Sequence, residues 1–217
     1  MTGSTVLVFD TSAAHCAAAL LVDGTVALRV DEMAKGQAEH LMPMLEDVLS
    51  GAGLTWRDLD GIGVGIGPGN FTGIRISVST ARGLALGLDV PAVGVSSLEA
   101  LAHGNSSCIA ALPAPRDRIY LQRFTAGPDS EPRLCDPMTE ALPPVSDVAL
   151  TALVAPDLPQ LGKRMGLRII APKYPLAEAI ARIAAGRLHD KQPAPAPLYL
   201  RPADAAPPKD AVPVLLG

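Results

Sequence analysis

Long apolar runs, paired cysteines and an early group of basic residues are all lacking in this sequence. No uninterrupted apolar run reaches the roughly 18 to 20 residues of a membrane-spanning helix. The first Lys or Arg is Arg29, so the N-terminus lacks the charged start of a signal peptide. The three cysteines, Cys16, Cys108 and Cys135, cannot all pair within the chain, and none belongs to a C-x-x-C motif. We therefore expect a soluble cytoplasmic protein with no membrane contact, whose cysteines are reduced packing residues.

Basic residues are scarce in the first half of the chain. Residues 1–103 hold 5 Lys and Arg against 11 Asp and Glu, while residues 104–217 hold 13 against 11. Neither half is basic enough to form a phosphate-binding surface on its own. The prolines divide the chain at the same place, since only 3 of the 21 precede Gly104. We therefore predict one domain over 1–103 and a second, proline-rich domain over 104–217.

Recognisable catalytic and metal-binding patterns are also missing. The sequence has no G-x-S-x-G motif, no cysteine with an evident histidine partner and no carboxylate pair of defined spacing. Those are the usual signs of nucleophilic hydrolysis. The four histidines have no ligand neighbours at local spacing, so a transition-metal site is not predicted. We expect no metal and no independent catalytic centre.

A glycine-rich loop is the most informative feature that is present. Between Ile62 and Ile76 an apolar strand runs into a glycine-proline turn and leaves it as a helix. Gly67, Gly69 and Gly73 permit positive φ and bring N–H groups close to another backbone or to an anion. The loop has no G-x-G-x-x-G register and lacks the Lys-Ser/Thr pair of a Walker loop. It therefore indicates either a phosphate-facing loop or a tight strand-to-helix turn without a ligand.

Apolar patterning predicts the order of the secondary-structure elements. In the first half we predict strands at 6–10, 17–22, 25–30, 61–66 and 90–95, and helices at 37–52 and 72–88. Asp23-Gly24 is a two-residue hairpin signal, and Ser96 with Glu99 has the spacing of a helix capping box. In the second half we predict strands at 107–112 and 119–124, a helix near 176–188, and an extended tail from Pro193 that lies on the body.

Several segments match the pattern of one protein family. Residues 67–76 read Gly-Pro-Gly-Asn-Phe-Thr-Gly-Ile-Arg-Ile, and residues 8–12 read Val-Phe-Asp-Thr-Ser. With further motifs at 40–43, 58–60, 81–85, 94–102 and 197–205, they closely resemble the TsaB (YeaZ) family, the bacterial tRNA threonylcarbamoyladenosine biosynthesis proteins. The likeness is dense in the first half and sparse in the second. It implies an α/β fold of two ribonuclease-H-like lobes, as in actin, sugar kinases and heat-shock chaperones, with the second lobe reduced.

Related ATP-using folds place an acidic group at the end of the first strand, near metal-bound phosphates. Asp10 ends the first predicted strand, so an adenine nucleotide could sit where it converges with the glycine loop. The candidate nucleotide-binding residues are Asp10, Thr11, Ser12, Gly67, Gly69, Asn70, Thr72 and Gly73. Alternatively, Asp10 and Thr11 satisfy turn amides. The alternative is supported by Pro113-Ala114-Pro115, which stands where family members commonly have Asp-Ala-Arg.

The two predicted helices of the first half carry more apolar surface than a lobe of about 100 residues can cover. The resemblance implies that they pair with a catalytic subunit of the TsaD type, or with a second copy of the chain when that partner is absent. The candidate interface residues are Leu41, Met42, Leu45, Gly73, Ser77, Thr80, Leu84 and Gly87. The alternative is that the two helices pack on each other in the core.

By resemblance, the chain is a noncatalytic subunit of the complex that places threonylcarbamoyl on the adenosine next to the anticodon. The TsaD-type subunit transfers the group and a TsaE-type ATPase supports turnover, so tRNA is reached through the complex. The TsaD-type subunit carries a His-x-x-x-His metal pair, and Ser97 and Leu101 occupy those two places here. Two alternatives stay open, an ATP-dependent kinase or phosphotransferase of the same fold, and a peptidase.

Overall fold

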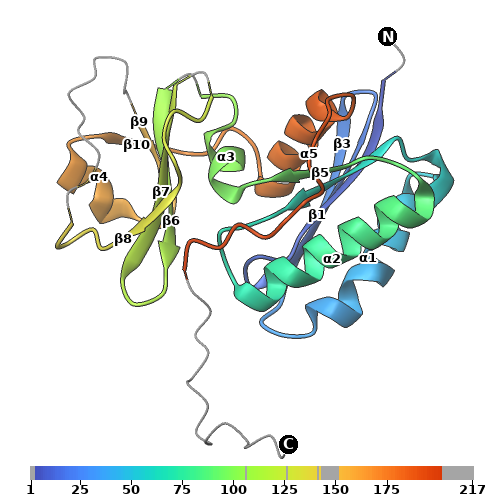
Figure 1. The fold of residues 1–217 in the computed structure, drawn as a ribbon, viewed down its shortest axis with the longest axis horizontal. Helices are drawn as coiled ribbons and strands as arrows, with labels where there is room; N and C mark the ends of the chain where they lie inside the picture. The colour runs from blue at the N-terminus through green and yellow to red at the C-terminus, as the bar shows by residue number, and fades with distance from the viewer. Residues whose placement is uncertain (1–2, 106, 126, 141, 143–151, 202–217) are drawn as a thin grey trace, which may run out of the picture.

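The computed structural model describes residues 3–105, 107–125, 127–140, 142 and 152–201, which form two lobes that lie side by side (Figure 1). Each lobe is built on a five-stranded sheet. No helix among these residues is long and apolar enough to cross a membrane.

The first sheet has the strand order β3-β2-β1-β4-β5. Its strands are β1 (Thr5–Asp10), β2 (His15–Val22), β3 (Thr25–Glu32), β4 (Gly61–Gly65) and β5 (Ala92–Val95). The first three are antiparallel neighbours, whereas β4 and β5 are added in parallel. The predicted hairpin is confirmed, because Asp23 and Gly24 both have positive φ (49° and 82°) and Val22 pairs with Thr25.

Helices α1 (Gln37–Gly51) and α2 (Phe71–Leu88) cover one face of the first sheet, and the short 3-10 helix η1 (Trp56–Asp58) lies between them in sequence (Figure 1). Alternate residues of β1 face these helices, so Leu7 and Phe9 belong to the same core cluster as Leu41, Leu45 and Ile74. Pro43 lies inside α1 without ending it.

Helix α3 (Ser97–Ala102) follows β5. The Ser96 Oγ accepts a hydrogen bond from the Glu99 N–H at 3.0 Å, as the capping box predicts. The Glu99 carboxylate, however, forms an ion pair with Arg187. Only the serine half of the predicted capping box is therefore seen, because the carboxylate is held by a helix from the far end of the chain.

The opposite face of the first sheet is covered by α5 (Leu176–Arg187), a helix from the second half of the sequence. Ala181 and Ala184 share a core cluster with Val6 and Val8 on β1. The approach is close, since a Cβ on Gly63 would lie 2.8 Å from the Cβ of Ala184. The first lobe is therefore completed by a helix from beyond residue 104.

The second sheet repeats the topology of the first. Its strands are β6 (Ser107–Ala114), β7 (Arg118–Thr125), β8 (Arg133–Cys135), β9 (Ala152–Val154) and β10 (Arg168–Ile170), in the order β10-β9-β6-β7-β8. Neighbours β6, β7 and β8 are antiparallel, while β9 and β10 are added in parallel with α4 (Pro159–Met165) between them in sequence. The predicted fold is confirmed: these are the two ribonuclease-H-like lobes of the actin superfamily. The second is reduced, because β8, β9 and β10 have only three residues each.

The described part of the tail lies on the first lobe, which confirms the prediction for residues 193–201. The Leu198 N–H donates to the Ile66 carbonyl oxygen at 2.8 Å. The Tyr199 ring lies 4.8 Å from the Phe71 ring, and its hydroxyl accepts a hydrogen bond from Arg75 Nε at 2.7 Å. Residues 202–217 of the predicted tail lie outside the described residues.

Candidate functional site

The glycine loop at 67–73 packs directly on the turn that follows β1. The Asn70 N–H donates to the Ser12 carbonyl oxygen at 2.6 Å. The Thr11 Oγ1 donates to the Gly73 carbonyl oxygen at 2.7 Å, across 62 residues of sequence. A Cβ on Gly73 would lie 1.8 Å from the Thr11 carbonyl oxygen, so no side chain fits between the two backbones. Turn and loop are therefore held together by backbone contact.

The other two glycines of the loop also face protein. A Cβ on Gly69 would lie 2.3 Å from the Ser12 carbonyl oxygen, and one on Gly67 would lie 2.5 Å from Ile74 Cδ1. Gly67 additionally has a φ of 89°, which a residue with a side chain rarely adopts. The sequence was compatible with a phosphate-facing loop or with a tight strand-to-helix turn that binds no ligand. The tight turn accounts for these glycines.

Asn70 begins α2 as its N-cap. The Asn70 Oδ1 accepts a hydrogen bond from the Gly73 N–H at 2.9 Å, which satisfies one of the donors that every helix start leaves without a partner. Gly69, Asn70 and Thr72 are exposed, whereas Gly67 and Gly73 are buried. The exposed side of the candidate nucleotide site is thus limited to the tip of the loop.

Asp10 is fully buried at the end of β1, together with Thr11 and Ser12. The Asp10 Oδ1 accepts hydrogen bonds from the Ser12 N–H (3.0 Å) and Ser12 Oγ (2.9 Å), and it lies 2.9 Å from His15 Nε2. The Asp10 Oδ2 has no hydrogen-bond partner among the described residues. The turn amide is satisfied, as the alternative to nucleotide binding expects, while the Asp10 Oδ2 is buried against Gly65.

We expect the pKa of His15 to lie above its ordinary value of 6.5, because its ring hydrogen bonds to Asp10 and this outweighs the effect of burial. Protonated His15 beside Asp10 therefore stabilises the folded state. This contribution is fully present below the unfolded-state pKa of about 6.5 and is lost as the pH rises through the higher folded-state pKa. An NMR titration of the His15 ring should show the raised value, and Asp10→Asn should lower it. A value at or below 6.5 in the wild-type protein would contradict the ion pair.

The wall that would face a nucleotide from the second lobe is the hairpin between β6 and β7. Pro113 and Pro115 are exposed there, and neither has an N–H to donate. Arg116 and Asp117 form the turn itself, both with positive φ (64° and 56°). The two prolines therefore remove two N–H donors from this hairpin.

Ser97 and Leu101, the two positions that the resemblance compares with histidines of the TsaD-type subunit, are buried. Leu101 packs in a core cluster with Leu98 and Tyr120. The Ser97 Oγ is buried without a hydrogen-bond partner among the described residues. Within the part of the chain that the structure covers, no group of three or more His, Cys, Asp or Glu side chains could hold a metal ion.

The three cysteines are buried and unpaired with one another, which confirms that they are packing residues. Burial raises the pKa of the Cys16 and Cys108 thiols to about 11. Since the thiolate is the nucleophilic form, neither thiol is activated for attack.

The predicted partner interface needs correction, because half of its residues are inside the lobe. Leu41 and Leu45 lie on the inner face of α1, are no more than 1% exposed and pack against the first sheet. Gly73 is buried against Thr11, and the Ser77 Oγ donates to the Gly65 carbonyl oxygen at 3.2 Å. These four residues cannot contact a partner while the lobe is folded. They pack between the helices and the sheet, as the alternative expects.

The other predicted interface residues remain at the surface, and two residues that the sequence pattern missed join them. Met42, Thr80 and Leu84 are half-buried and Gly87 is exposed, as are Gly83 and Leu86. We name this set, Met42, Thr80, Gly83, Leu84, Leu86 and Gly87, the α1–α2 surface. Leu86 is 86% exposed. Its spacing of three residues from Gly83 places both on one side of α2, and this spacing was the sequence signal that could have identified the exposed face.

Comparison with known proteins gives consistent findings. Residues 31–129 match the family model for TsaD, the tRNA N6-adenosine threonylcarbamoyltransferase. The tRNA threonylcarbamoyladenosine biosynthesis protein TsaB of Escherichia coli (strain K12) is 35% identical over 125 residues, which are 55% of this chain and 54% of the relative. The chain thus matches about half the length of this curated relative.

Two solved structures from Pseudomonas aeruginosa are similar over most of the chain. YeaZ has 30% identity and a TM-score of 0.69, covering 85% of this chain and 93% of its own. A protein described as uncharacterized, with similarity to peptidase YEAZ, has 30% identity and a TM-score of 0.74. The match covers 91% of this chain and 100% of that protein. Identity at this level over nearly whole chains, with the two-lobe topology and the clamped glycine loop, shows that the chain belongs to the TsaB (YeaZ) family.

Proposed function

We propose that this chain is a noncatalytic subunit in the biosynthesis of N6-threonylcarbamoyladenosine in tRNA, working in the cytoplasm. It pairs with a TsaD-type transferase through the α1–α2 surface, and a TsaE-type ATPase supports the complex. The names of the TsaB relatives and the TsaD family match support this proposal. With a net charge of −4, the chain reaches tRNA through the complex rather than by its own surface.

The exposed face of α2 is the main observation that supports the proposed pairing with the transferase. Gly83 and Gly87 lie inside this helix, and a Cβ on either would have no atom within 4 Å. Each glycine costs the helix about 1 kcal/mol relative to alanine. Leu86 beside them is exposed to water. Small residues next to an exposed leucine favour close contact with a partner helix. The same face serves a homodimer when the transferase is absent.

Three features support a noncatalytic role. The loop backbone packs on Thr11 and Ser12, and Pro113 and Pro115 supply no N–H. By resemblance, Ser97 and Leu101 stand where the transferase has histidines. The buried Asp10 Oδ2, which has no hydrogen-bond partner among the described residues, is the feature of this turn that favours a bound group. The residues of this chain alone do not fit a complete nucleotide site. We therefore propose that an adenine nucleotide binds only in the assembled complex.

A reconstituted reaction tests this function. We expect mass spectrometry of tRNA nucleosides to detect N6-threonylcarbamoyladenosine when the chain, the TsaD-type subunit, the TsaE-type ATPase and threonylcarbamoyl-adenylate are all present, and to lose it when the chain is omitted. Equal modification without the chain would overturn the proposal.

The isolated chain should hydrolyse ATP only at the background rate, because it lacks a complete phosphate site. Robust hydrolysis that disappears in Asp10→Ala would contradict the noncatalytic role and favour a kinase or phosphotransferase.

A further inference from the structure

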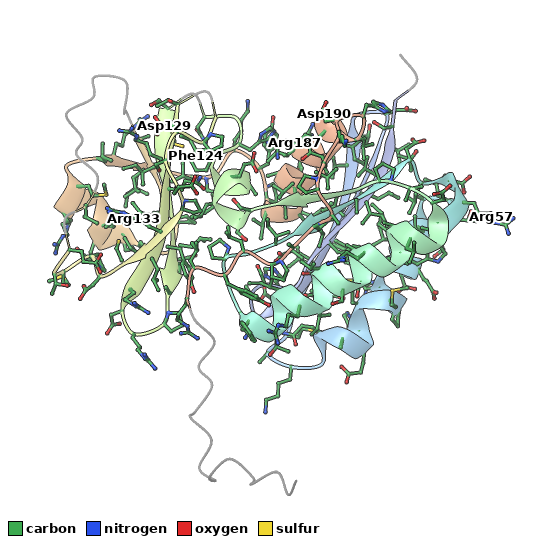
Figure 2. All side chains as sticks on the ribbon, viewed as in Figure 1. Arg57, Phe124, Asp129, Arg133, Arg187 and Asp190 are labelled. Carbon is green, nitrogen blue, oxygen red and sulfur yellow. The ribbon has the colours of Figure 1, made fainter. Side chains whose placement is uncertain are left out.

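A cavity of about 450 Å³ lies at the junction of the two lobes, away from the glycine loop. One wall is α5, with Arg182 and Arg187, and another is the segment of His103 and Asn105 that leads into β6. Phe124, at the end of β7, belongs to the second lobe. Figure 2 places Phe124 and Arg187 on the two sides of the junction. The cavity is therefore formed by both lobes, and its volume is that of a small-molecule site.

Both arginines are held in place by carboxylates. Arg182 donates from Nε and one Nη to Glu178 Oε1 at 2.9 and 2.7 Å. Arg187 donates from its two Nη atoms to the two carboxylate oxygens of Glu99. Each pair uses two of about five guanidinium N–H donors. No other hydrogen bond to either guanidinium is present among the described residues, so preoriented donors remain for a ligand.

Asn105 contributes a donor that has no partner. Its Nδ2 is buried and makes no hydrogen bond within the described part of the chain. A buried donor left unsatisfied costs about 1 to 3 kcal/mol. Asn105 lines the cavity, so a rotation of its amide toward an acceptor bound there would remove this cost.

Three cations lie around His103. Burial is the main cause that lowers the pKa of His103, the Glu99 carboxylate opposes it as the next largest effect, and Arg182, Lys173 and Arg187 lower the pKa further. Two of these cations lie over the Tyr174 ring. The Arg182 Cζ is 4.7 Å and the Lys173 Nζ is 5.5 Å from the centre of the ring. The positive charge is thus held by packing around an aromatic ring.

We propose that this cavity binds a small molecule that carries a phosphate group, with Arg182, Arg187 and Asn105 as its donors. Three residues with N–H groups around one cavity match an oxyanion that has several acceptor oxygens. Because α5 is packed on the first sheet and Phe124 belongs to the second, the ligand fixes the angle between the lobes. Arg187 also lines a groove beside Gly83 and Leu86, but none of the three donors belongs to the α1–α2 surface. The site therefore goes beyond the pairing with the transferase.

Two variants of one ion pair test the site. Arg182→Gln and Glu178→Gln both abolish the Arg182–Glu178 pair, so their effects on folding are shared. They change the charge at the cavity in opposite directions. Arg182→Gln removes the cation, whereas Glu178→Gln removes the carboxylate that neutralises it and leaves the Arg182 cation unpaired. We therefore expect Arg182→Gln to weaken phosphate binding at least about tenfold and Glu178→Gln to tighten it several-fold, the tenfold change corresponding to about 1.4 kcal/mol.

The measurement is an NMR titration of the full chain with inorganic phosphate and, in a second arm, with AMP. The His103 ring signal should shift in a saturable way and its pKa should rise, while the exposed His189 stays unchanged. Tighter binding of AMP identifies a phosphomonoester, and equal or weaker binding identifies free phosphate. A His103 signal unmoved at about 10 mM of both probes, or equal weakening by the two variants, would overturn the proposal.

Discussion

Replacing Gly83 by arginine should abolish pairing with a TsaD-type subunit while the chain stays folded. Gly83 is exposed inside α2, with open space where a Cβ would stand. Arginine is a better helix former than glycine, so the isolated chain should gain about 0.5 to 1 kcal/mol. At the centre of an interface the same side chain adds bulk and a charge that must lose its water. We expect association to weaken at least about 30-fold, which is about 2 kcal/mol.

Gly83→Ala is the matched control. It brings a similar gain in helix propensity but adds only one methyl group, so pairing should stay within a few-fold of wild type. Thermal unfolding, pull-down with the TsaD-type subunit and nucleoside mass spectrometry on the same preparations separate folding from pairing. The arginine variant should also stay monomeric in sedimentation. Normal pairing and modification by a folded Gly83→Arg protein would refute the interface.

The surface position is a better test than residues chosen from the sequence pattern alone. Thr80 and Leu84 are half-buried, and Leu84 packs against the core beneath α1 and α2. A charge at Leu84 would disturb folding and pairing together. A Cβ on Gly83 would have no atom within 4 Å, so an alanine there meets no neighbouring side chain and the effect on pairing can be measured separately from folding.

Most of the first lobe follows from the sequence because its signals are local. Asp23-Gly24 forms the two-residue hairpin, and the long apolar patterns of 37–52 and 72–88 give helices within one residue of their observed ends. Alternation along β1 also separates its two buried faces, with Leu7 toward α1 and α2 and Val8 toward α5.

The second lobe could be predicted only in part, because much of it is determined by pairing between distant segments. Strands of three residues, such as β9 and β10, are too short to show a period of two. Their register comes from the parallel neighbours β6 and β9. The duplicated topology leaves no sequence repeat, since strand order depends on backbone geometry and burial, which many sequences satisfy.

The candidate site shows the same limit. Sequence spacing identified the glycines of the loop, but it could not tell whether they approach a ligand or another backbone. The answer depends on the turn at Thr11 and Ser12, about 60 residues away. Small residues at Ser77 and Gly83 likewise fit a core and a surface equally well, so the rotation of α2 about its axis was not fixed by its sequence.

Replacing Gly73 by alanine should destabilise the protein strongly, although alanine favours a helix by about 1 kcal/mol at an ordinary position. The new Cβ would lie 1.8 Å from the Thr11 carbonyl oxygen, which belongs to backbone and cannot rotate away. Relief requires the start of α2 to move off the first turn, which also strains the Thr11–Gly73 and Asn70–Ser12 hydrogen bonds. We expect a loss of about 2 to 4 kcal/mol in the free energy of unfolding.

Gly83→Ala again provides the control, because it is the same substitution in the same helix. Denaturant unfolding of the two variants should give opposite signs, with Gly73→Ala less stable than wild type and Gly83→Ala more stable. In thermal unfolding, Gly73→Ala should lower the Tm by roughly 5 to 15 °C. Since Gly73 contacts only its own lobe, the loss should be the same with and without a partner. Equal stabilisation by both alanines would show that the loop is not clamped on the turn. The backbone of 67–73 would then be free to receive a phosphate in the chain alone.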